Sequence, residues 1–151
     1  MTYEIVELGE KLVEGISIKT SNTNPNMQKE IGGLWQRFLT EEYGKIEQKQ
    51  NRKTIGIYTD YEGDYTKPYR FMTMAEIKEP SSDIGEREIR TIQAGKYAKF
   101  VVKGDMQTEV AKCWNAIWNM DLDRKYTYDF EEYQDIEAMN NQEIHIYIAI
   151  R

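Results

Sequence analysis

Two segments of this chain, 79 positions apart, carry the same helical pattern. In both, apolar residues recur at i, i+3, i+4, i+7 and i+8, a spacing that lines one face of a helix. The apolar positions are Ile31, Leu34, Trp35, Phe38 and Leu39 in the first segment and Val110, Cys113, Trp114, Ile117 and Trp118 in the second. Met27-Gln28 likewise faces Met106-Gln107, and Asn26 and Asp105 are suited to cap the two helices. The agreement indicates an internal duplication.

Strand patterns surround each predicted helix. The expected strands are residues 3–8, 11–20, 54–61 and 69–78 in the first half, and 88–93, 96–103, 128–134 and 143–150 in the second. The pairs Gly9-Glu10 and Ala94-Gly95 predict a hairpin at the start of each half. The sequence therefore predicts an α+β fold of one domain, 1–151. It consists of two β-β-α-β-β units, about 1–79 and 84–151, with pseudo-two-fold symmetry, antiparallel sheets and one long helix each.

Composition narrows the functional classes. The net charge is −6, and the basic residues are scattered among acids, so we expect no direct contact with nucleic acid. No apolar run is long enough to cross a membrane and no signal peptide is recognisable, which predicts a cytoplasmic protein. Cys113 is the single cysteine and His145 the single histidine, so we expect neither a metal site nor a cofactor. We interpret Cys113 as a core thiol and His145 as a surface residue.

The alternation within the strands predicts a groove between the two halves. The isoleucines at 144, 146, 148 and 150 should lie under a helix, and Phe130 is assigned to the same face. Glu131 would then point into a concave surface opposite the helices. The expected lining is Glu131, Tyr133, Tyr58, Tyr147, Met72 and Met74, with Trp114 reaching the end of the groove. Aromatic rings, methionines and one carboxylate suit a flat, apolar, cationic ligand.

Several of these stretches resemble the GyrI-like family. They are residues 92–100, Gly104, Trp114, residues 129–133 and residues 144–150. This family comprises effector-binding domains of multidrug-sensing transcription activators and gyrase-inhibitory proteins. The resemblance implies that Glu131 neutralises lipophilic cations. It also implies that a DNA-binding regulator or gyrase could be a partner protein.

These observations predict a stand-alone module that binds amphipathic, cationic organic compounds, for drug sensing or sequestration. Two alternatives remain open. One is an inhibitor of the DNA gyrase type that acts through protein contacts. The other is a hydrolase of electrophilic natural products, in which Glu131 would position water. Because no independent catalytic constellation is recognisable, we name no catalytic residues and favour binding over catalysis.

Overall fold

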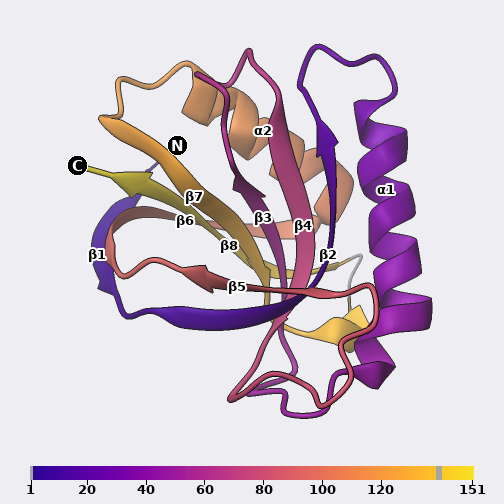
Figure 1. Ribbon diagram of the computed structural model, residues 1–151. Coiled ribbons are helices and arrows are strands. Elements are labelled where there is room, and N and C mark those ends of the chain that lie inside the picture. The colour runs from indigo at the N-terminus through magenta and orange to yellow at the C-terminus, as the bar shows by residue number, and fades with distance from the viewer. Residues whose placement is uncertain (1, 139–140) are drawn as a thin grey trace.

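The computed structural model describes residues 2–138 and 141–151. Its strands form one antiparallel eight-stranded sheet in the order β1-β6-β8-β7-β3-β4-β2-β5, and Figure 1 shows how strongly this sheet curves. The strands are β1 (Glu4–Leu8), β2 (Lys11–Thr20), β3 (Thr54–Thr59), β4 (Tyr69–Glu76), β5 (Glu88–Ile92), β6 (Gly95–Asp105), β7 (Arg124–Tyr133) and β8 (Asn141–Ile150). The helices α1 (Met27–Arg37) and α2 (Met106–Trp118) complete the predicted α+β fold.

The strand order shows the duplication in space. Exchanging β1–β4 with β5–β8 reverses the order, so the two halves are related by a pseudo-two-fold axis between β3 and β7. Those two central strands pair antiparallel, and Gly56 of β3 lies opposite Glu131 of β7. Aligning Tyr58 with Tyr133 also makes Gly56 and Glu131 equivalent positions of the repeat, at an offset of 75 instead of the 79 that relates the helices. The pseudo-axis therefore passes between Gly56 and Glu131.

The hairpins predicted at Gly9-Glu10 and Ala94-Gly95 are wrong. Strand β1 pairs with β6, and β5 pairs with β2, so the halves exchange their first strands. Gly9-Glu10 and Ala94-Gly95 each connect two consecutive strands that do not pair with each other. A short connection that contains glycine is compatible with a hairpin and also with two strands that diverge. In this chain each of these strands pairs with a strand of the other half.

The helix-bearing face of the sheet holds one hydrophobic cluster. Trp35 of α1 and Trp114 of α2 pack there against sheet residues such as Phe100. The isoleucines of β8 belong to this cluster, as predicted. Since α1 and α2 contact the same cluster, both helices cover a single face of the sheet.

The opposite face holds a second cluster, to which all eight strands contribute. Phe130 lies in this cluster, fully buried, so its assignment to the helix-covered face was wrong. The sheet curves around these apolar side chains, which are packed against one another in the described part of the chain. The predicted lining residues Met72, Met74 and Tyr147 are among them, so the prediction of a groove lined by these residues opposite the helices was also wrong. Phe130 alternates with Asp129 and Glu131, and these two acids therefore face the helices.

The ends of the two helices differ. Asp105 caps α2 by accepting a hydrogen bond from the Thr108 amide at 3.0 Å, whereas the side chain of Asn26 makes no such bond to α1. After α1 the chain continues through a π-helix, Phe38–Glu42, and a short 3-10 turn, Tyr43–Lys45. The N-cap prediction is therefore confirmed for α2 only.

A buried ion-pair network fixes the end of the π-helix to the sheet. Arg87 donates to Glu14 of β2 at 2.7 Å and to Glu42 at 3.2 Å. The hydroxyl of Ser81 donates to Glu14 at 2.8 Å. The segment between the halves is thus tied to both β2 and the end of the helical region.

Within the described residues, neither helix has the length and apolar character that crossing a bilayer requires. No group of three or more potential metal-binding side chains occurs in that part of the chain.

Candidate ligand-binding site

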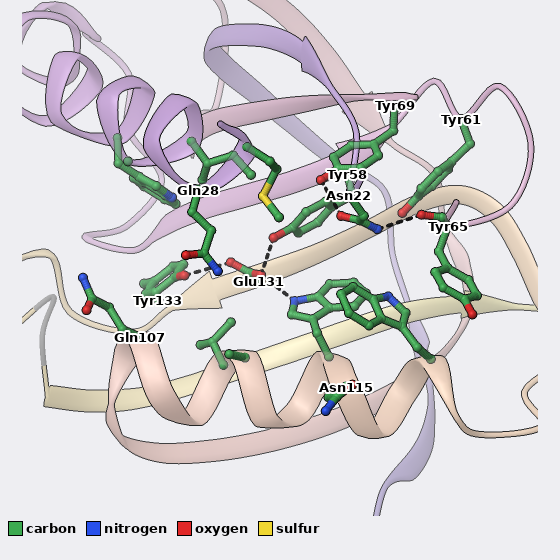
Figure 2. Close-up of a pocket in the computed structure, with 18 of the residues that line it drawn as sticks. Asn22, Gln28, Tyr58, Tyr61, Tyr65, Tyr69, Gln107, Asn115, Glu131 and Tyr133 are labelled. Carbon is green, nitrogen blue, oxygen red and sulfur yellow. Dashed lines mark hydrogen bonds between the residues drawn. The ribbon is translucent and has the colours of Figure 1, made fainter. Parts of the chain in front are cut away.

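A cavity of about 570 Å³ lies between α1 and α2 above the central strands (Figure 2). This volume falls in the range of small-molecule sites, which is roughly 300–1,000 Å³. Its lining comes from both helices, from strands β3, β4 and β7, from Asn22, and from Tyr61 and Tyr65 in the loop that follows β3. The cavity is therefore on the helix-bearing face, where the alternation places Glu131.

The two helical walls are equivalent by the repeat. Each wall contributes a glutamine in its first turn, a small residue in its middle and a tryptophan one turn later. These are Gln28, Gly32 and Trp35 on α1 and Gln107, Ala111 and Trp114 on α2. The small residues leave room between the helices, and the tryptophans present apolar rings to the space.

Glu131 lies at the centre of the cavity floor and is 2% exposed. Its Oε2 accepts hydrogen bonds from the Tyr58 hydroxyl at 2.8 Å and from the Trp114 indole at 2.7 Å. Its Oε1 accepts one from the Tyr133 hydroxyl at 2.8 Å. Figure 2 shows this arrangement, in which three neutral donors from three different elements hold one carboxylate.

The protonation equilibria follow from this burial. Burial raises the pKa of Glu131 above the ordinary glutamate value, and the three hydrogen bonds only partly oppose it. Burial, followed by the charge of Glu131, raises the pKa of Tyr58 and of Tyr133 well above the tyrosine value. Both tyrosines thus remain protonated donors, and a positive charge placed beside Glu131 would favour its ionised form.

Glu131 has no basic partner among the residues that the structure describes. The lining contains one other charged side chain, Arg124 at the start of β7. Arg124 is occupied elsewhere, because its Nη2 lies 2.7 Å from Oδ2 of Asp129. The negative charge of Glu131 is therefore uncompensated within the described part of the chain.

The equivalent position in the first half holds Gly56 instead of a glutamate. A Cβ added there would lie 3.0 Å from Cζ2 of Trp35 and 3.1 Å from Cζ of Phe71. Glycine lets these two rings close over the strand. The symmetric scaffold thus provides a single carboxylate, and the cavity is electrostatically one-sided.

Of the residues predicted from the sequence, four line the cavity: Glu131, Tyr133, Tyr58 and Trp114. Met72, Met74 and Tyr147 do not, because they are packed in the cluster on the opposite face of the sheet. Their placement followed from the inverted assignment of Phe130, which moved the expected groove to the wrong side.

Other lining residues were missed. Trp35, assigned from the sequence only to the apolar face of the first helix, also lines the cavity, as do Tyr61, Tyr65, Tyr69 and Arg124. The signal available was the density of tyrosines between positions 58 and 69. In the structure Asn22 organises this group, donating to the Tyr65 carbonyl at 2.8 Å and accepting from the Tyr69 hydroxyl at 2.9 Å.

Two residues considered for chemistry lie outside the cavity. Cys113 is fully buried, and burial raises the pKa of its thiol to about 12, so the reactive thiolate is suppressed. His145 lies 2.8 Å from a carboxylate oxygen of Glu143, on the side of β8 that carries Tyr147.

The cavity itself offers a ligand a desolvated carboxylate, hydroxyl and indole hydrogen-bond donors, and aromatic rings.

Comparison with known proteins agrees with this geometry. Residues 4–150 match the family model described as Cass2, integron-associated effector binding protein. An integron cassette protein, VCH_CASS2, from the mobile metagenome of Vibrio cholerae is 30% identical, with a TM-score of 0.81 over 99% of this chain and 95% of that one. A comparison with curated proteins found no match.

Two further solved structures share the fold. SAV2435 bound to tetraphenylphosphonium is 20% identical, with a TM-score of 0.80 over 100% of this chain and 94% of the other. The EcmrR C-terminal domain is 16% identical, with a TM-score of 0.59 over 100% and 99%. These folds agree with the predicted GyrI-like effector-binding architecture, and the chain belongs to the Cass2 family of integron-associated effector-binding proteins.

Proposed function

We propose that this protein binds amphipathic organic cations in the cavity between α1 and α2, with Glu131 as the counter-ion. The observation that carries the proposal is a buried carboxylate held by three neutral donors, without a cation among the described residues. Buried charges in proteins are normally paired. A cationic ligand would supply the partner that the fold omits.

The aromatic walls suit the rest of such a ligand. Tyr58 and Trp114 contact each other with ring centroids 4.8 Å apart, and both donate to the carboxylate of Glu131. Aromatic faces attract cations and accommodate flat apolar groups. SAV2435, whose fold is similar, has been solved bound to tetraphenylphosphonium, a lipophilic cation. The protein would then sense or sequester such compounds.

The expected affinity is moderate. Burying about 300 Å² of apolar ligand surface contributes roughly 7 kcal/mol, and cation–π contact and charge pairing add about 1–2 kcal/mol each. Association costs at least about 4 kcal/mol. A dissociation constant on the order of tens of micromolar follows, which is consistent with broad selectivity.

Replacement of Glu131 tests the proposal. We expect Glu131→Gln to weaken tetraphenylphosphonium binding about tenfold, equivalent to roughly 1.4 kcal/mol, and to leave binding of neutral triphenylphosphine oxide unchanged. Fluorescence of Trp35 and Trp114, which line the cavity, provides the measurement.

The matched control is Glu132→Gln. Glu132 is the adjacent buried carboxylate, but it lies 3.4 Å from the Nζ of Lys53 and does not line the cavity. This variant should bind both compounds as the unmodified protein does. An equal loss for cation and neutral compound in Glu131→Gln would show that the carboxylate is not the charge partner.

The raised pKa of Glu131 also supports a second candidate, hydrolysis of electrophilic natural products. A carboxylate of this kind can accept a proton from an attacking water, and the Tyr58 hydroxyl lies 2.8 Å from it. Time-dependent consumption of a reactive cyclopropane compound, lost in Glu131→Gln, would identify catalysis. Saturable binding without consumption would exclude it.

A further inference from the structure

Besides the carboxylate of Glu131, which lacks a counter-ion among the described residues, the lining of the cavity includes a residue with an unpaired hydrogen-bond donor. Arg124, the other charged residue of the lining, is 7% exposed. Its Nε is buried and has no hydrogen-bond partner among the described residues. Buried donors without partners are rare in native proteins, and each calls for an explanation.

The surroundings of Arg124 hold the guanidinium in place but leave Nε unused. Nη2 donates to Asp129 at 2.7 Å, and the ring of Tyr126 lies 4.3 Å from the guanidinium carbon. Asp129 also accepts from the Tyr61 hydroxyl at 2.6 Å and from the amide of Ala149 at 2.9 Å. The contact with Asp129 therefore uses Nη2 of the guanidinium and not Nε.

The backbone beside Arg124 is irregular. Strand β7 shifts register between Arg124 and Asp129, and Tyr126 within this irregularity has a φ of 55°. Left-handed backbone is uncommon for a bulky residue and persists where the surrounding structure enforces it. The ring of Tyr126 is the one that lies against the guanidinium.

Arg124 and Glu131 occupy different positions along the sheet. Arg124 pairs with Ile150 of β8, and Glu131 pairs with Ile146, four positions earlier. At a rise of about 3.3 Å per residue, their backbone positions lie about 13 Å apart. The guanidinium is bonded to Asp129, which stands two residues, or about 7 Å, from Glu131 along β7. Arg124 is absent from the groups that influence the pKa of Glu131, so the two side chains can contact different parts of one ligand.

We propose that the ligand carries a hydrogen-bond acceptor oxygen roughly 7–13 Å from its cationic centre, a spacing estimated from the strand rise, and that Nε of Arg124 binds this oxygen. The inference rests on the proposed function and adds a second recognition element to it. The preferred ligands are bipolar molecules with an aromatic cation at Glu131 and a carbonyl, ester or ether oxygen at Arg124. Because Nε is shielded from solvent in this structure, binding requires the side chains around the guanidinium to rearrange.

A matched series of phosphonium ions tests this. Triphenylphosphonium carries an alkyl chain of two, five or eight methylenes, which ends either in a methyl ester or in a sec-butyl group, which has the same number of heavy atoms and no oxygen. With the unmodified protein, the ester at one of the longer spacings should bind about tenfold more tightly than its alkyl counterpart, as expected for one hydrogen bond to a charged group. At two methylenes the ester and alkyl compounds should bind equally.

Two variants assign the gain to the guanidinium. Arg124→Lys keeps a positive charge beside Asp129 but removes Nε, so the ester should lose its advantage while the alkyl compound keeps its affinity. Arg151→Lys is the matched control, because Arg151 is exposed and pairs with Asp123 outside the cavity. Here the ester advantage should remain.

The outcomes separate the two proposals. If the alkyl compounds bind with dependence on Glu131 but the ester gives no gain at any length, the role of Arg124 is overturned and the cation site stands. A bridging water already bonded to Nε would give that result. A gain that survives in Arg124→Lys would also overturn it. If neither compound binds, both proposals fail.

Discussion

Glu14 and Glu131 are both buried glutamates on strands of the same sheet, but their surroundings are opposite. Glu14 accepts hydrogen bonds from Arg87 at 2.7 Å and from Ser81. Burial would raise its pKa, but hydrogen bonds from Ser81 and Arg87 outweigh the burial and hold the pKa below its ordinary value. Glu131 has only neutral donors, and burial raises its pKa.

The difference separates a structural carboxylate from one available to a ligand. Glu14 has its cation, Arg87, within the fold and is fully buried. Glu131 lines a cavity and has no cation among the described residues. A buried charge without a partner destabilises the fold, which is the expected signature of a site whose partner is exogenous.

The largest effect is expected from Glu14→Gln. Removing one member of a buried ion pair leaves the other without compensation, and the free energy of unfolding should fall by about 3 kcal/mol. Urea denaturation measures this. Under conditions in which the variant is fully folded, its affinity for the cation should not change. Glu47→Gln, at an exposed glutamate that contacts Ser82, should alter stability by less than about 0.5 kcal/mol. A similar small change for Glu14→Gln would remove the distinction drawn between the two sites.

A smaller effect of opposite sign is expected from Glu131→Gln. At a pH above the raised pKa of Glu131, replacing the uncompensated buried charge by a neutral isostere should raise the free energy of unfolding by about 1 kcal/mol, in keeping with the trade-off between stability and function at binding sites. Urea denaturation without ligand tests this. A loss of stability as large as that of Glu14→Gln would mean that Glu131 is a structural residue.

The pH dependence of stability should also differ in sign. The folded-state pKa of Glu14 lies below the unfolded value of about 4.3, so its contribution is present above that value and is lost as pH falls through the folded pKa. The folded-state pKa of Glu131 is raised, so folding favours its protonated form. The stability advantage of Glu131→Gln should therefore shrink as the pH is lowered and vanish once Glu131 is protonated.

Much of the fold could be predicted from the sequence because the duplication is explicit. The paired tryptophans Trp35 and Trp114 identified both helices, and strict alternation identified β8 and its helix-facing side. The same alternation grouped Glu131 with Tyr133, and the repeat related Tyr133 to Tyr58. These predictions rest on local or periodic patterns, and the structure confirms that Tyr133 lies beside Glu131 and that the isoleucines of β8 face the helices.

What could not be predicted depends on non-local packing. Alternation separates two faces but does not say which face meets the helices when both are apolar. Phe130 was therefore placed on the wrong side, and Met72, Met74 and Tyr147 followed it. The residues of the two short connections do not indicate that β1 and β5 pair with strands of the other half. The proposed role of Arg124 depends on a register shift in β7, which produces no periodic pattern in the sequence.

The most direct test of the account is the dissociation constant of tetraphenylphosphonium measured from pH 8 to pH 5. This cation has no titratable group, so any pH dependence belongs to the protein. For the unmodified protein the affinity should fall as the pH decreases through the raised pKa of Glu131, whereas Glu131→Gln should bind weakly and independently of pH. An unmodified protein whose affinity does not change with pH, or a variant that shows the same dependence, would contradict the claim that Glu131 is the counter-ion.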